Sequence, residues 1–266
     1  MPYRVNEPVD GSRPVIDDEQ LKRMLNESTP GFFERNRFRI VTLVLIVVNV
    51  AVFAAEVLLS GMRFDVPTRT LVDMGAMYAP YVQAGELWRL VTPMFLHMDL
   101  MHLGFNMVAL YSVGEVLERV LGRGSFLLLY FVAGVTGNAV SYAADVVLAG
   151  APSVSAGAST SVFGLFVAVA LLGLLHKGNR RMFAEYSKGM LGVIGVNVAY
   201  TLLVPSVSVS GHLGGALGGL LAMLMVPAKS LRVPNAARAA MAVLWVAALG
   251  WTLAGRAVGR KAAWGR

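Results

Sequence analysis

The sequence predicts an all-α, polytopic membrane protein with six or seven transmembrane helices. The 266 residues are 56% hydrophobic and only 15% charged, whereas a soluble domain is usually about half apolar and a quarter charged. The apolar residues are concentrated in stretches long enough to cross a hydrocarbon core about 30 Å thick. Basic residues lie between these stretches, and the positive-inside rule explains their distribution.

Charge and cysteine content narrow the possible partners. The net charge of +7 would suggest nucleic-acid binding in a soluble protein. Here the basic residues lie between apolar segments, so we expect the lipid bilayer as the surrounding and no nucleic-acid partner. The chain has no cysteine, which excludes a disulfide framework and a thiolate metal site.

Residues 1–38 are expected to form a cytosolic tail. The first thirty or so residues are polar and contain no apolar core of a signal peptide, so none is predicted to be cleaved. Arg35, Arg37 and Arg39 stand just before the first apolar run. Because basic residues mark the cytosolic side, the first helix is predicted to run outward. The compact form of the chain favours the bacterial plasma membrane as its location.

Seven apolar segments follow this tail. They cover about residues 40–59, 93–117, 125–148, 159–175, 189–204, 211–226 and 239–255. The connection 60–92 is rich in aromatic residues and is expected at the membrane surface. We predict a six-helix core over 39–228 and a seventh helix with a tail over 229–266. The tail departs from the charge rule, since Arg256, Arg260, Lys261 and Arg266 would lie outside.

Polar groups with catalytic potential gather at one level of this predicted topology. The second, fourth and sixth segments all enter the membrane from outside. Near their starts they carry His97, His102 and Asn106, then Ser159, then His212. The topology was assigned from charge alone, so the coincidence of these residues is independent evidence. Polar groups within spanning helices are costly and usually functional.

These residue types fit acyl transfer. A serine needs a base to become a nucleophile, and histidine titrates in a range suited to that work. A developing oxyanion needs preorganised donors, and His102 and Asn106, four residues apart, share one face of a helix. Ser159, His212, His102 and Asn106 can therefore form an acyl-transfer site, without an evident carboxylate as a third member.

Each of these residues also has a simpler structural interpretation. A serine at a helix start is most often an N-cap, and a membrane histidine can simply bond a neighbouring helix. Gly211, Gly215 and Gly219 form a small-residue pattern that lets helices approach closely. That packing would also bring His212 towards Ser159. Taken together, and at one depth, the residues favour catalysis.

Metal binding is the competing chemistry. His97 and His102 are five residues apart, which is about 140° around an ideal helix, so they should not share a face. The H-E-x-x-H pattern of zinc proteases is absent. The sequence therefore predicts no metal site.

Four motifs resemble the rhomboid family of intramembrane serine proteases over about residues 40–226. They are Glu86-Leu87-Trp88-Arg89 for E-x-W-R, His97 to His102 to Asn106 for the second-helix motif, Gly157-Ala158-Ser159 for the active-site motif, and Gly211-His212-Leu213-Gly214-Gly215 for the sixth-helix motif. Their order along the chain is the family's order, which is more specific than any single motif. The resemblance implies a rhomboid-like bundle.

The resemblance also implies a role for each matching residue. Ser159 would be the nucleophile and His212 the general base. His102 and Asn106 would form the oxyanion hole with the backbone N–H of Ser159. His97 and Gly157 would support the site, and Glu86, Trp88 and Arg89 would have a structural role in the first loop. The family cleaves transmembrane protein substrates near the outer membrane face and needs no cofactor or metal.

One residue departs from the family's pattern. The glycine that usually follows the nucleophile is Thr160 here, and a β-branched residue resists positive φ. Because Ser159 and Thr160 should open a helix, we expect threonine to be tolerated. The alternatives are a catalytically inactive relative that binds transmembrane clients, and a transporter. A transporter would predict internal repeats and broken helices near mid-membrane, and the sequence has neither.

Overall fold

The computed structural model describes residues 39–147, 152–178, 180–203 and 207–254, together with the isolated positions 19, 34 and 36. The chain divides into two units, Met1–Arg37 and Phe38–Arg266, and nearly all of the described residues belong to the second. The predicted cytosolic tail lies almost entirely outside the described residues, as do the basic residues after 254.

The described part of the second unit is helical. Its α-helices are α3 (Ile40–Leu59), α4 (Thr68–Met74), α5 (Ala79–Ala84), α6 (Leu100–Leu121), α7 (Arg123–Val147), α8 (Ser159–Leu175), α9 (Arg180–Leu203), α10 (Val209–Met225) and α11 (Asn235–Ala254). Two 3-10 turns, η1 (Leu87–Leu90) and η2 (Thr92–Phe95), and two short strands, β1 (Met77–Tyr78) and β2 (Val154–Ser155), complete it. The predicted all-α fold is confirmed.

The apolar helices agree with an integral membrane protein. Within the described residues, α3, α6, α7 and α11 are long and apolar enough to cross a bilayer, and α8 and α10 are apolar helices of 17 residues. The predicted bounds of the first, third, fourth and sixth segments are correct to within two residues.

Three predicted helix starts are wrong. The second helix begins at Leu100 rather than 93, because Pro93 lies in the 3-10 turn η2 and Asp99 caps α6. The Asp99 carboxylate accepts a hydrogen bond of 2.7 Å from the backbone N–H of His102. The fifth helix begins at Arg180 rather than 189. The seventh helix, α11, begins at Asn235 rather than 239, directly after Pro234.

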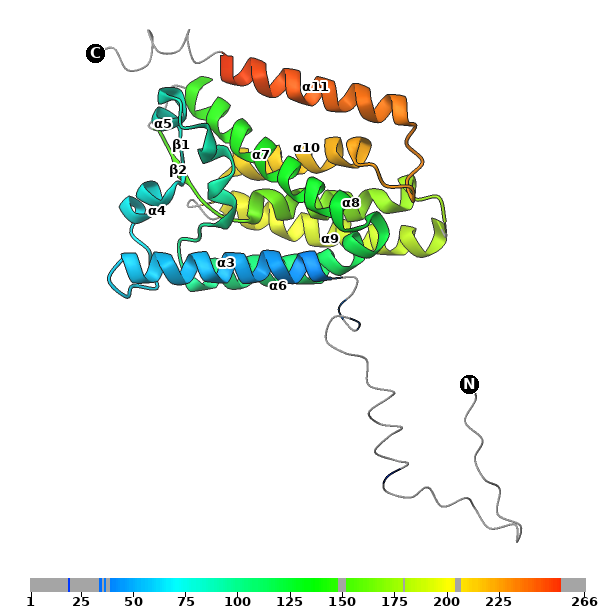
Figure 1. The fold of residues 1–266 in the computed structure, drawn as a ribbon, viewed down its shortest axis with the longest axis horizontal. Helices are drawn as coiled ribbons and strands as arrows, with labels where there is room; N and C mark the ends of the chain where they lie inside the picture. The colour runs from blue at the N-terminus through cyan, green and yellow to red at the C-terminus, as the bar shows by residue number, and fades with distance from the viewer. Residues whose placement is uncertain are drawn as a thin grey trace. The chain divides into compact units, whose positions relative to one another are not determined.

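Helix α8 lies at the centre of the unit. It packs against α6, α7, α9 and α10, and ten of its 17 residues are buried. Figure 1 shows α3 and α6 side by side along one side of the bundle and α11 along the opposite side. A residue at the start of α8 is therefore surrounded by other helices.

Glycines hold α10 against α8. A Cβ on Gly215 would lie 2.0 Å from the carbonyl oxygen of Thr160, and one on Gly219 would lie 2.2 Å from that of Gly164. These contacts confirm the predicted small-residue packing for both glycines. Gly211 was expected on the same face, but it faces α7, where its nearest side chains include Ser141. A helix has 3.6 residues per turn, so positions four apart drift around its axis.

The connection 60–92, which the sequence left without assigned structure, is folded. It contains α4, β1, α5 and η1. Strand β1 pairs antiparallel with β2, with Met77 opposite Ser155 and Tyr78 opposite Val154. The first loop is thereby attached to the segment that leads into Ser159.

Candidate active site

Ser159 and His212 meet where α8 and α10 begin. The Oγ of Ser159 lies 2.8 Å from Nε2 of His212. The N-cap position of α8 is Ala158, which makes no side-chain cap hydrogen bond, so the simpler interpretation of Ser159 as an N-cap is wrong. The hydroxyl is within hydrogen-bond distance of an imidazole, as a nucleophile and its base require.

The His212 ring has further contacts on two sides. Its other nitrogen, Nδ1, lies 2.7 Å from the hydroxyl oxygen of Thr201 on α9. The ring of Phe163 stacks on it, with 4.1 Å between centroids and 19° between planes. Only 6% of the His212 surface is exposed. The orientation of the imidazole is therefore fixed by α8, α9 and α10 together.

Gly157 brings the chain close to His102 and Ser159. Its φ of +138° is a conformation that L side chains rarely adopt. A Cβ at this position would lie 2.8 Å from Nε2 of His102 and 3.3 Å from Oγ of Ser159. The Gly157 N–H donates to the carbonyl of Pro93 at 2.8 Å. Glycine suits this position because it adopts this backbone conformation readily and has no Cβ that would collide with His102.

His102 and Asn106 face the same cavity as the serine and histidine. The cavity has a volume of about 190 Å³, and its lining includes His102, Asn106, Ser159 and His212. Asn106 donates one amide hydrogen to the carbonyl of His102 at 2.9 Å, which leaves its second amide hydrogen for another acceptor. The four residues predicted to form an acyl-transfer site are thus brought together.

His97 lies beside this group, but not on the helix expected for it. It precedes α6, and its backbone N–H donates to the two Glu56 carboxylate oxygens at 3.0 and 3.3 Å. The rings of His97 and His102 are in contact, with 5.2 Å between centroids. The prediction that these histidines point apart is wrong because it assumed one continuous helix. Within the described ranges, no group of three histidine, cysteine or acidic residues could hold a metal.

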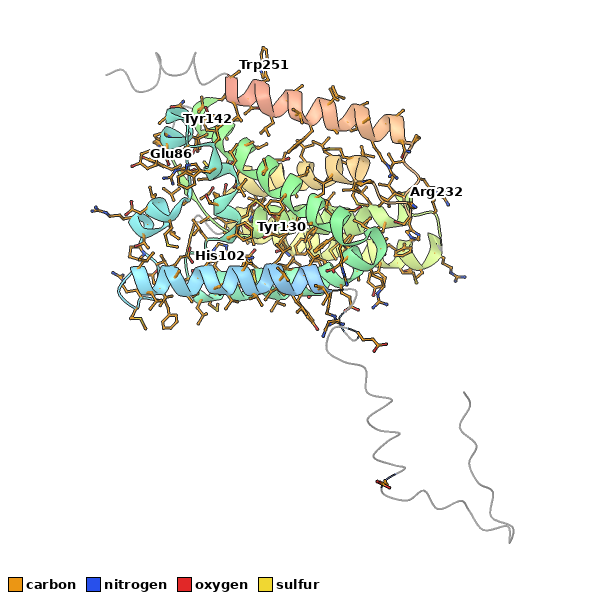
Figure 2. All side chains as sticks on the ribbon, in the orientation of Figure 1. Glu86, His102, Tyr130, Tyr142, Arg232 and Trp251 are labelled. Atoms are coloured by element: carbon orange, nitrogen blue, oxygen red, sulfur yellow. The ribbon has the colours of Figure 1, made fainter. Side chains whose placement is uncertain are left out.

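The Glu86-Leu87-Trp88-Arg89 motif lies in the first loop. Arg89 Nε donates to Glu86 at 2.7 Å, and Nη1 donates to the carbonyls of Val72 and Ala76 at 2.7 and 2.9 Å. Its guanidinium lies over the Trp88 ring, and its side chain is only 4% exposed. Figure 2 shows Glu86 and His102 towards one end of the helices and Arg232 towards the other. These contacts join turns of the loop, which supports the expected structural role.

Thr160, the departure from the family's pattern, has ordinary helical backbone. It is the second residue of α8, and among the described non-glycine residues only Met62 has a positive φ. The conformation that would disfavour threonine is therefore absent from this position.

Two contacts of His212 were not predicted from the sequence. Phe163 begins the Phe163-Gly164-Leu165 run that follows the active-site motif, but the sequence does not indicate that its ring stacks on His212. Thr201 could have been found, because the predicted topology places the end of the fifth segment at the outer face, at the level of Ser159 and His212. A hydroxyl at that level belongs to the same group of polar residues.

Comparison with known proteins agrees with the fold. The family described as "Rhomboid domain" matches residues 84–229, more than half of the chain. The chain is 39% identical over 170 residues to the rhomboid protease GluP of Bacillus subtilis, which covers 64% of this chain and 31% of GluP. It is 34% identical over 173 residues to the putative rhomboid protease YdcA of the same species, covering 64% of this chain and 84% of YdcA.

A more distant relative is the rhomboid-like protease 3 of Toxoplasma gondii. The two chains are 34% identical over 154 residues, which cover 57% of this chain and 56% of the relative. The match therefore spans about a third of GluP, about half of the Toxoplasma protein and most of YdcA. The chain belongs to the rhomboid family of intramembrane proteases.

Proposed function

We propose that the chain is an intramembrane serine endopeptidase in which Ser159 is the nucleophile and His212 the general base. The observation that carries this proposal is the 2.8 Å contact between Ser159 Oγ and His212 Nε2 beside a cavity that both residues line. A serine hydroxyl becomes nucleophilic when an imidazole is placed to accept its proton.

The reaction follows from these two side chains. Ser159 Oγ attacks the carbonyl carbon of the scissile bond while its proton passes to His212 Nε2. The carbon–nitrogen bond then breaks, and the leaving amine takes that proton. Water next gives a proton to Nε2 and attacks the acyl-enzyme, which releases the second product and restores the Ser159 hydroxyl.

The negative charge on the attacked carbonyl oxygen needs donors. We assign this role to the second amide hydrogen of Asn106, the His102 ring and the backbone N–H of Ser159. The N–H of a residue at a helix start has no partner within its helix, so that of Ser159 is available. Preorganised donors of this kind typically contribute 10²–10³-fold each. Gly157 would support the site by leaving room for the His102 ring. His97 would support it by packing against the same ring.

The proposed substrates are transmembrane segments of other proteins, cut near the outer membrane face. By the charge argument, residues 1–38 are cytosolic. Residues 39–228 would form the catalytic core, and residues 229–266 would add a seventh helix and a tail. A helical substrate hides its carbonyls in hydrogen bonds. We therefore expect preference for segments destabilised by glycine or proline, with a small residue before the scissile bond. Equal cleavage after strong helix formers are introduced there would contradict this preference.

The deciding experiment is cleavage of a single-span transmembrane reporter in liposomes. The wild-type chain should cut it, and Ser159→Ala and His212→Ala should lower kcat by more than about 1000-fold, as loss of a nucleophile or base does. Both variants should keep the thermal unfolding midpoint of the wild type within a few degrees. Unchanged cleavage by Ser159→Ala would exclude this nucleophile. If all three fail to cut, cleavage by Thr160→Gly would identify Thr160 as the cause and would favour a relative that only binds clients.

A further inference from the structure

The nitrogen of His212 that faces away from Ser159 lies against an unusual neighbour. Thr201 and Phe183 are the only buried residues among the described side chains of α9. Thr201 is 5% exposed, and its hydroxyl oxygen lies 2.7 Å from His212 Nδ1 and 2.7 Å from the carbonyl oxygen of Asn197. Thr201 is therefore a buried polar side chain on a helix with few buried residues, and it touches the proposed base.

We propose that Thr201 is a positioning residue that holds His212 in the tautomer protonated at Nδ1. It occupies the place that a carboxylate takes in a Ser-His-Asp triad, where the third member sets the tautomer and orientation of the imidazole. This inference rests on the proposed function, because the tautomer matters only if Nε2 accepts the proton of Ser159.

The tautomer follows from counting hydrogens. A threonine hydroxyl has one hydrogen and two lone pairs. In a helix, threonine commonly donates that hydrogen to the carbonyl four residues earlier, and here Thr201 donates to Asn197. Its oxygen can then only accept from His212, so Nδ1 must carry a hydrogen. In the neutral ring Nε2 then has a free lone pair, which is directed at Ser159 Oγ.

The opposite tautomer fits the same atoms poorly. With the hydrogen on Nε2, Thr201 would have to donate to Nδ1. The carbonyl oxygen of Asn197 would then face a hydroxyl oxygen at 2.7 Å without a hydrogen between them. Nε2–H would donate to Ser159, and the serine could not pass its proton to the ring. One arrangement thus satisfies all the groups and also activates the nucleophile.

The same contact favours the charged form of the ring during the reaction. When Nε2 takes the proton of Ser159, Nδ1–H still donates to Thr201, which still donates to Asn197. A chain of aligned hydrogen bonds strengthens each member in a low-dielectric interior. Thr201 acts through His212 and is not placed to touch the substrate's reacting atoms.

The kinetic test compares Thr201→Val with Thr201→Ser in the liposome assay. Valine keeps the volume and removes the hydroxyl, and should lower kcat about 10- to 100-fold, the range for a hydrogen bond to a charged group. KM should change less than about twofold, because no substrate contact is lost. Serine keeps the hydroxyl and should restore kcat to within about threefold of the wild type.

The matched control is Thr252→Val on α11. Thr252 donates to the carbonyl of Ala248 at 2.9 Å, so this variant loses the same kind of bond within a helix but no contact with a histidine. Its kcat should equal that of the wild type. Wild-type kcat in Thr201→Val, with Ser159→Ala inactive, would overturn the role of Thr201 and leave the proposed protease intact.

A second readout does not depend on cleavage. Side-chain ¹⁵N NMR in micelles distinguishes the two tautomers, and comparison with His212→Gln assigns the signal among the four histidines of the chain. His212 should be protonated at Nδ1 in the wild type and should gain the Nε2–H form in Thr201→Val. Equal tautomer populations in both proteins would overturn the inference. If no cleavage occurs in any protein, the proposed function fails while this measurement still decides the tautomer.

Discussion

The two ring nitrogens of His212 are held by two helices that are packed very differently. On the Ser159 side, α10 meets α8 through glycines that touch backbone, and ten residues of α8 are buried. On the Thr201 side, α9 has only two buried residues among its described side chains. The distance between serine and histidine is therefore fixed by rigid backbone contact. The proposed tautomer contact comes from a helix with far fewer buried neighbours.

The largest effect should come from breaking the rigid side. In Gly215→Ala, the new Cβ would lie 2.0 Å from the carbonyl oxygen of Thr160, and backbone cannot yield as a side chain can. Overpacking costs about 1–3 kcal/mol, and misplacing catalytic groups by about 1 Å can cost 10²-fold in rate. We expect kcat to fall at least about 100-fold in the liposome assay. The thermal unfolding midpoint, measured in micelles, should also fall.

Gly250→Ala on α11 is the control for this prediction. No atom lies within 4 Å of the Cβ that it would add, so activity should be retained and the unfolding midpoint should not fall. Wild-type activity in Gly215→Ala would mean that α8 and α10 can separate without moving Ser159 from His212, and the contrast between the two sides would lose its basis.

A smaller effect is expected from Phe163, which belongs to the rigid side but acts through its ring. Phe163→Leu keeps an apolar side chain and removes the flat surface stacked on His212. Aromatic pairs contribute about 0.5–1.5 kcal/mol beyond burial, so kcat should fall about 3- to 10-fold. Phe163→Tyr keeps the stacked ring and should remain close to the wild type. Equal kcat in the leucine and tyrosine variants would show that stacking does not orient the imidazole.

The sequence could predict which residues form the site, but not the backbone turns and ring contacts that hold them. Ser159, His212, His102 and Asn106 could be grouped because charge assigned the sides of the helices, and each residue type has a recognisable chemistry. The start of α6 could not, because Pro93 and Asp99 lie within an apolar run and their turn and cap require the folded backbone. The positive φ of Gly157 and the stacking of Phe163 depend on neighbours from other segments.

The next effect concerns the contact between α8 and α9 away from the site. Ser187 Oγ accepts from the N–H of Gly173 at 3.1 Å and donates to the carbonyl of Phe183 at 2.8 Å. Ser187→Ala should lower the free energy of unfolding by about 1 kcal/mol, the usual contribution of a hydrogen bond. Gly173 is about 21 Å along α8 from Ser159, so kcat should change less than about twofold. A larger fall in kcat would show that the contact of Ser187 with α8 affects the geometry of Ser159 and His212.

The smallest effect is expected on the exposed part of α9. In Gly192→Ala, no atom lies within 4 Å of the new Cβ, in contrast to Gly215. Alanine favours a helix over glycine by up to about 1 kcal/mol, so the unfolding midpoint should rise slightly while kcat is unchanged. The measurement is thermal unfolding in micelles beside the liposome assay. Lower activity with an unchanged midpoint would mean that this face of α9 touches the substrate, and its exposure would then serve binding rather than reflect loose packing.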